Sequence, residues 1–104
     1  MLRIYPVALE MVREVAACCQ RIGKHDRDLA RQLRRSSMSV VLNMAEGSAV
    51  RDGRRRTRYG DALGSAQETR AGIQAAVAIG YLRSDEQLEK RFAHIIGTLV
   101  KLTR

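Results

Sequence analysis

Proline and cysteine are scarce in this sequence and tryptophan is absent, and these shortages exclude several classes of protein. One proline and eight glycines among 104 residues are too few for a disordered, collagen-like or turn-dense all-β chain. The two cysteines, Cys18 and Cys19, are adjacent, so they cannot form a disulfide framework. Free thiols are typical of a reducing cytosol. The length is that of one domain with a core of its own.

Long apolar runs are also missing. The longest weakly polar stretch, residues 71–82, is far too short to span a bilayer. Together with the free thiols, this predicts a soluble cytoplasmic protein with no membrane contact.

Acidic residues are few relative to basic ones. The chain has 19 Lys and Arg against 11 Asp and Glu, which gives a formal net charge of +8. This surplus indicates an anionic partner, although charge bears on partners and solubility rather than on the fold.

The first half of the chain has the periodicity of two helices. The spacing predicts a helix over residues 6–22, with Leu9, Val12, Ala16 and Cys19 on its inward face. A second helix is predicted over residues 27–46, capped by Asp26 and ended by Gly47. Its predicted inward face consists of Leu29, Leu33, Ser36 or Ser37, Val40 and Met44.

The second half predicts two more helices. The third covers residues 53–79, opens at Asp52 or Gly53, and stops at Gly80. Its predicted inward face consists of Tyr59, Leu63, Ala66, Arg70, Ile73 and Val77. The fourth covers residues 84–102 and begins with a capping box in which Ser84 is the cap and Gln87 lies three residues later. Its predicted inward face consists of Leu88, Phe92, Ile95, Leu99 and Leu102.

Three glycines lie inside the predicted third helix, namely Gly60, Gly64 and Gly72. Each costs up to about 1 kcal/mol relative to alanine, which is tolerable where a small residue lets another helix approach closely. They indicate a tight helix contact, either within the chain or between chains.

Four amphipathic helices joined by short loops place sequential neighbours antiparallel. No strand pattern competes with this interpretation. The fold class is therefore all-α, a single-domain up-down-up-down four-helix bundle over residues 1–104.

Two blocks of the sequence resemble a known bacterial family. Residues 32–47 read QLRRSSMSVVLNMAEG, close to the family pattern Q-L-R-R-A-x-x-S-I-x-x-N-I-A-E-G. Residues 62–68 read ALGSAQE and are followed by Gly80-Tyr81-Leu82, which is similar to the family's A-L-G-S-x-x-E and L-G-Y-L. The family is that of the four-helix bundle proteins encoded within intervening sequences of 23S ribosomal RNA genes.

The resemblance implies a ring-like homopentamer. It also relates the chain to the accessory proteins of diversity-generating retroelements, which are basic pentamers that bind a reverse transcriptase and nucleic acid. The chain departs from the family at residues 51–58, where RDGRRRTR replaces an entry usually made of Ser followed by acidic and aromatic residues.

Arginines crowd the entry to the third helix: Arg51, Arg54, Arg55, Arg56 and Arg58 lie within a few residues of one another. The planar guanidinium suits phosphate oxygens, so the cluster predicts sequence-independent binding of RNA or DNA. Pairing with a neighbouring subunit and a plain solvated surface are the alternatives. Cations near a helix N-terminus oppose the helix dipole, which favours an anionic partner or a salt bridge.

Several polar residues have two interpretations each. Arg34 and Arg35 either extend the basic surface or pair with Glu46 or Glu68 of another helix. Asn43 and Glu46 share one helical face, where we expect them to bond a neighbouring helix and fix its register rather than to act in catalysis.

Catalytic and metal sites find little support in the sequence. His25 and His94 are far apart, the adjacent cysteines lack the spacer of a zinc site, and no glycine-rich phosphate loop is present. The sequence therefore predicts a non-enzymatic, oligomeric nucleic-acid-binding protein with no cofactor, no metal and no catalytic residue. The first alternative is a ring-shaped adaptor for another protein, such as a reverse transcriptase, and the second is an enzyme.

Overall fold

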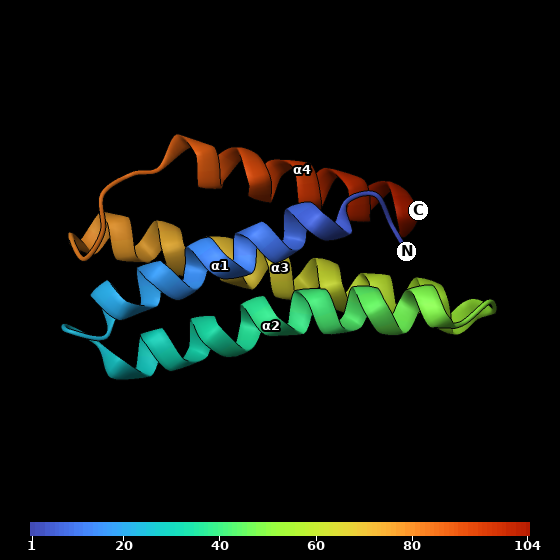
Figure 1. The fold of residues 1–104 in the computed structure, drawn as a ribbon, viewed down its shortest axis with the longest axis horizontal. Helices are drawn as coiled ribbons and strands as arrows, with labels where there is room; N and C mark the ends of the chain where they lie inside the picture. Colours follow the sequence, from blue (N-terminus) through green and yellow to red (C-terminus); the bar gives the residue numbers. More distant parts are fainter.

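The computed structural model describes residues 1–104 and contains four helices and no strand. The helices are α1 (Tyr5–Ile22), α2 (Arg27–Ala49), α3 (Gly53–Ile79) and α4 (Glu86–Leu102). Consecutive helices run in opposite directions along a bundle that measures 43 × 24 × 20 Å, and both chain ends lie at the end where α2 turns into α3 (Figure 1). The predicted all-α, up-down-up-down bundle is confirmed.

Three aspartates begin three of the helices. The side chain of Asp26 accepts a hydrogen bond from the Leu29 backbone N–H at 2.9 Å, and that of Asp52 accepts one from the Arg54 N–H at 2.9 Å. Asp26 was predicted as a cap, and Asp52 was one of the two residues predicted to open α3. The predicted cap at Ser84 is wrong, because Asp85 accepts from the N–H groups of Gln87 and Leu88 and α4 starts one residue after it. A carboxylate at that position satisfies two free N–H groups and complements the positive end of the helix.

The end of α2 also differs from the prediction. Gly47 does not end the helix, which continues to Ala49, and is instead buried within its last turn. A Cβ atom at this position would lie 2.5 Å from Cε1 of Tyr59, so the missing side chain is what allows the tyrosine ring to pack on α2. Gly80 does end α3 as predicted, with a φ of 96° that favours glycine.

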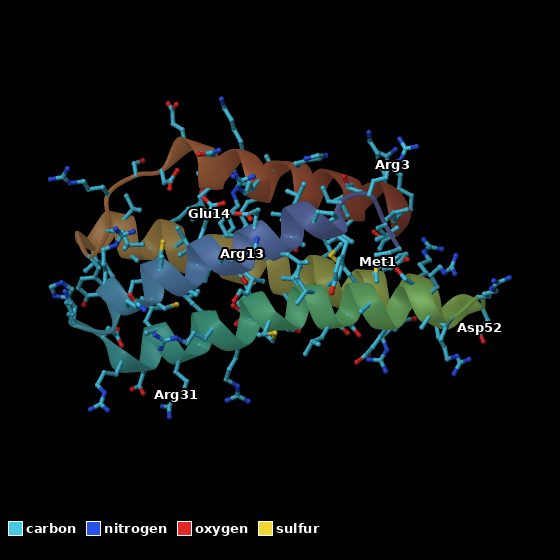
Figure 2. All side chains as sticks on the ribbon, viewed as in Figure 1. Met1, Arg3, Arg13, Glu14, Arg31 and Asp52 are labelled. Carbon is cyan, nitrogen blue, oxygen red and sulfur yellow. The ribbon has the colours of Figure 1, made fainter.

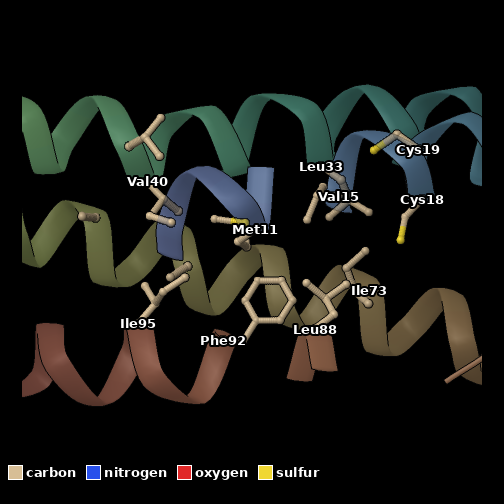
Figure 3. Packing of buried hydrophobic residues seen from close by; sticks show 14 of the residues in the cluster. Met11, Val15, Cys18, Cys19, Leu33, Val40, Ile73, Leu88, Phe92 and Ile95 are labelled. Carbon is tan, nitrogen blue, oxygen red and sulfur yellow. The ribbon is translucent and has the colours of Figure 1, made fainter. Parts of the chain in front are cut away.

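A continuous apolar core runs along the bundle, and Figure 3 shows part of it around Met11 and Phe92. The predicted inward faces of α2 and α4 are buried except for Leu29, which is half-buried, and Leu102, which is exposed. On α3, Tyr59, Ala66 and Ile73 are buried, while Leu63, Arg70 and Val77 are half-buried.

The predicted inward face of α1 is rotated from the buried face in the structure. Of its four residues, Cys19 is buried and Val12 is half-buried, but Leu9 and Ala16 are exposed. The buried positions are Ala8, Met11, Val15, Cys18, Cys19 and Ile22. Apolar residues occupy two adjacent stripes of this helix, and only packing against α2 and α4 selects between them.

Small and hydroxyl-bearing residues bring α2 and α3 close together. Gly72 faces Leu33, whose side chain fills the space that a Cβ atom would need. The Thr69 hydroxyl donates to the Ser36 Oγ at 2.8 Å, and the hydroxyls of Ser39 and Ser65 are 2.8 Å apart. The tight contact predicted from the α3 glycines is therefore present within the chain at Gly72.

Candidate nucleic-acid interface

The positive charge of the chain is concentrated at one end of the bundle. We define the basic end as residues 1–5, 46–58 and 100–104, which lie together where the chain ends and the α2–α3 connection meet (Figures 1 and 2). Its basic side chains are Arg3, Arg51, Arg54, Arg55, Arg56, Arg58, Lys101 and Arg104. Only Glu46 and Asp52 oppose these eight cations.

The other end of the bundle is almost balanced. Residues 21–31 and 80–86 contain five basic and four acidic side chains. Of the net charge of +8, the basic end therefore holds +6, and a polyanion would experience the strongest attraction there.

The arginine run at the start of α3 opposes the dipole of α3 itself, but two of its arginines complement the dipoles of α2 and α4. The Nε–H of Arg55 donates to the carbonyl oxygens of Val50 at 2.7 Å and Gly47 at 3.2 Å, at the C-terminal end of α2. The Nε–H of Arg56 donates to the carbonyl oxygen of Thr103 at 2.9 Å, at the C-terminal end of α4. Carbonyl groups at helix C-termini lack intrahelical partners and carry partial negative charge. The antiparallel bundle thus supplies acceptors for arginines whose charge is unfavourable at the N-terminus of their own helix.

Arg54 is held by the aspartate that caps its own helix. Its Nε and Nη2 donate to the Asp52 carboxylate at 3.0 and 2.9 Å. These side-chain bonds, with the capped Arg54 N–H, lower the pKa of Asp52 below its ordinary value and raise the pKa of Arg54. Both side chains remain largely exposed, so the guanidinium is oriented without being withdrawn from solvent.

Arg58 forms an ion pair across the α2–α3 seam. Its Nε lies 3.2 Å from Oε2 of Glu46. The expected pairing of Arg34 and Arg35 with Glu46 or Glu68 is wrong within the chain, since none of its six ion pairs uses either arginine. Arg34 and Arg35 lie about three turns from Glu46 along α2, too far to reach it, and Glu46 pairs with Arg58 of α3 instead.

The polar motif on α2 has only part of its predicted role. Asn43 donates from Nδ2 to the carbonyl oxygen and hydroxyl of Ser39 in its own helix, both at 3.0 Å, rather than to a neighbouring helix. It reaches α3 only through the contact of Ser39 with Ser65. Glu46 does contact a neighbouring helix, through Arg58. Glu68 is exposed and lines a groove between α2 and α3 together with Arg35.

Arg70, expected on the inward face of α3, meets an acid across the bundle. Its Nη2 lies 3.0 Å from Oε2 of Glu89 on α4. Glu14 on α1 and Arg91 on α4 form a second interhelical pair. These pairs lie away from the basic end and fix α4 against its neighbours.

Seven arginines were predicted to bind nucleic acid, and five of them lie at the basic end. Arg34 and Arg35 lie in the first half of α2, outside the basic end. They line a groove together with Arg58 of α3. The prediction missed Arg3, Lys101 and Arg104, which are remote in the sequence from the arginine run. The antiparallel order of the helices is the signal that could have found them, because it brings the start of α1 and the end of α4 to the α2–α3 connection.

The remaining reactive groups are dispersed or buried. Cys18 and Cys19 are both buried free thiols, and burial raises the pKa of each. No group of three His, Cys, Asp or Glu side chains is arranged to hold a metal ion. None of the four helices is long and apolar enough to cross a membrane.

Comparison with known proteins agrees with this fold. The family model described as "23S rRNA-intervening sequence protein" matches residues 1–101. A crystal structure of a protein with unknown function from the S23 ribosomal protein family of Bacteroides thetaiotaomicron is 18% identical to this chain and superimposes with a TM-score of 0.83. The match covers 97% of this chain and 98% of that one, and at this identity it establishes the fold. No curated protein matches the chain. Because the family model matches nearly the whole chain, the protein belongs to the 23S rRNA-intervening sequence protein family.

Proposed function

We propose that the protein is a non-enzymatic, cytoplasmic nucleic-acid-binding protein that contacts phosphates of RNA or DNA through its basic end. The observation that carries the proposal is the placement of eight basic side chains against two acidic ones, from three separate segments, at one end of the bundle. Every basic side chain at this end is exposed.

The arrangement suits backbone contacts better than base recognition. Arg54, Arg55 and Arg56 use their Nε–H groups in contacts within the chain, which orients each planar guanidinium while other N–H groups point to solvent. Oriented guanidinium groups bind phosphate oxygens at a smaller entropic cost than free side chains do. Tyr59, at the start of α3, is buried and Tyr5 is half-buried against the core, so this end has no fully exposed ring for base stacking. We therefore expect binding that depends strongly on salt and weakly on nucleotide sequence.

The same proposal includes a homo-oligomer, with a pentamer as the expected size. What supports self-association is the outer face of α3, where Gly60 and Gly64 are exposed and have no neighbour within 4 Å of a Cβ position. Glycines inside a helix are unfavourable, and no contact within the chain explains these two. A ring would repeat the basic end on each subunit, so weak contacts would add through effective concentration.

Assembly is tested by light scattering of the purified chain. We expect a mass of several subunits, reduced by Gly64→Leu and unchanged by Gly97→Leu, since Gly97 is also exposed and helical but lies on α4. A monomeric wild-type protein would contradict this part of the proposal without bearing on phosphate binding.

Nucleic-acid binding is tested by fluorescence anisotropy with a labelled twenty-nucleotide RNA of random sequence at about 50 mM salt, where phosphate contacts are strong. The informative variant is Arg3→Ala/Arg51→Ala, because both side chains are exposed and neither belongs to an ion pair of the chain. The matched control is Arg27→Ala/Arg83→Ala, which removes the same charge from the opposite end. We expect the first variant to bind at least about fivefold more weakly than the second. Equal loss in both variants, or no binding by the wild type, would overturn the proposal.

A further inference from the structure

A second exposed surface lies on the outer side of α2, toward the middle of the bundle. Met38 and Leu42 are one helical turn apart on the same face of α2, and they are 47% and 54% exposed. The other large apolar residues of α2 face the core, as Leu33, Val40 and Met44 do. These two side chains therefore form an apolar pair that the fold of the single chain leaves uncovered.

Arginines flank this apolar pair on two sides. Arg34 and Arg35 precede it by one turn on α2, and Arg58 of α3 lies beyond its other end. With Ser39, Asn43 and Glu46, these residues line an open groove of about 500 Å³. The groove contains a single carboxylate, Glu46, which is already paired with Arg58. Arg34 and Arg35 have no carboxylate partner in the chain.

We propose that this groove docks an acidic amphipathic helix of another protein. The partner's apolar residues, one turn apart, would cover Met38 and Leu42, and its carboxylates would meet Arg34 and Arg35 at one end and Arg58 at the other. Met, Leu and Arg together are a typical composition for a helix-binding surface, because methionine adapts to varied partners and arginine selects the charge. The groove shares Glu46 and Arg58 with the basic end, so the variants that test it change only Arg34, Arg35, Met38 and Leu42, which lie outside that end.

The length of the groove sets the spacing of the partner's charges. One end of the groove is at Arg35, and the other is at Glu46, which pairs with Arg58. Arg35 and Glu46 are eleven residues apart on α2, which corresponds to about 16 Å. A partner helix that lies along α2 would therefore present its two acidic clusters about three turns apart, on either side of its apolar pair.

Two other occupants fit the groove less well. A nucleic acid would gain little from Met38 and Leu42, which offer no donor to a phosphate. A second copy of this chain has few carboxylates to bring to Arg34 and Arg35, because six of its eleven acidic side chains are in ion pairs within the chain and Asp26 and Asp85 cap helices.

The test uses a fluorescein-labelled helical peptide as the probe. Its centre has two leucines one turn apart, each end has three glutamates, and the remaining positions are alanine. The reference peptide has lysines in place of the glutamates. We expect the acidic peptide to bind and the lysine peptide to bind at least about tenfold more weakly, because charge selects the partner.

Variants of the protein then locate the docking site. Met38→Ala/Leu42→Ala and Arg34→Ala/Arg35→Ala should each weaken binding of the acidic peptide at least about fivefold, since truncating central anchors costs most. These positions are exposed and helical, so alanine preserves the fold. Ile79→Ala removes an apolar side chain that is at least as exposed but lies on α3, and it should change binding less than about twofold.

Each contrary outcome has a definite meaning. No binding of the acidic peptide, equal binding of the lysine peptide, or equal loss in Ile79→Ala would overturn the proposal. Loss of RNA affinity in Met38→Ala/Leu42→Ala would assign the groove to nucleic acid instead. A lower mass of that variant in light scattering would assign it to a second copy. Phosphate binding at the basic end would stand in all of these cases, because none of these substitutions lies there.

Discussion

The Nε–H of Arg56 donates to the main-chain carbonyl oxygen of Thr103 at 2.9 Å, and this bond joins the first turn of α3 to the end of α4. Forty-seven residues separate the two in the sequence. The guanidinium lies at the C-terminus of α4, which is the negative end of that helix's dipole. The charge of Arg56 is therefore favourable there, although it opposes the dipole of α3. Arg55 makes the equivalent contact with the end of α2. These two arginines are therefore part of the scaffold as well as of the basic surface.

Removing the Arg56 contact should lower stability. We expect Arg56→Ala to reduce the free energy of unfolding by about 0.5–1.5 kcal/mol, because an exposed, charge-assisted hydrogen bond contributes about that much. Urea unfolding followed by circular dichroism measures the change. The control is Arg83→Ala, an exposed arginine in the α3–α4 connection, which should be within about 0.5 kcal/mol of wild type. Equal stability of the two variants would show that the Arg56 bond adds nothing.

Gly47 should not tolerate a methyl group. An alanine there would place its Cβ 2.5 Å from Cε1 of Tyr59, and the ring would have to shift within a buried contact. We expect Gly47→Ala to destabilise by at least about 1 kcal/mol despite the better helix propensity of alanine. Gly97→Ala is the matched substitution in open space and should stabilise by about 0.5–1 kcal/mol. Thermal unfolding of both variants checks the pair, and two changes of the same sign would refute the steric account.

Asp52 should contribute a pH-dependent part of the stability. Its bonds to Arg54 lower its pKa in the folded state below the ordinary value of 3.8. Its stabilising effect is therefore present above pH 3.8 and is lost as the pH falls through the lower, folded-state pKa. Titration of the Asp52 side-chain carbon by NMR measures that pKa directly. Arg54→Ala should move it back toward the ordinary value, and an unchanged titration would mean that Arg54 is not the cause.

The two thiols should be slow to react in the folded protein. Burial raises the pKa of Cys18 and Cys19, so little thiolate forms near neutral pH and reagents cannot reach it. We expect a disulfide reagent at pH 8 to label the native chain at least about tenfold more slowly than the chain in urea. Rapid labelling of one thiol in the native state would show that α1 opens locally around it.

Periodicity and capping chemistry predict most of the fold. The runs of apolar residues on α2 and α4, the aspartate caps at Asp26 and Asp52, and the glycine at the end of α3 all depend on local preferences that the sequence contains. The face of α1 could not be predicted in the same way, because two adjacent stripes are apolar and tertiary packing selects one. The same holds for Gly47, whose role depends on Tyr59, a residue of the next helix.

The candidate site was only half predictable. The arginine run stands out in the sequence, but its partners do not, because carbonyl groups at helix ends have no sequence signature. Arg3 and Arg104 join the run only through the antiparallel order of the helices. Likewise, Arg58 pairs with Glu46 because the α2–α3 connection folds it back onto the end of α2, whereas Arg34 and Arg35 lie about three turns away from Glu46 along that helix.

The salt dependence of RNA binding tests the basic end most directly. Each phosphate contact contributes about 0.7 to the slope of log K against log salt for single-stranded RNA. If Arg3 and Arg51 each contact a phosphate, Arg3→Ala/Arg51→Ala should reduce the magnitude of that slope by about 1.4, whereas Arg27→Ala/Arg83→Ala should leave it nearly unchanged. The same slope in both variants would contradict the assignment of nucleic-acid binding to this end of the bundle.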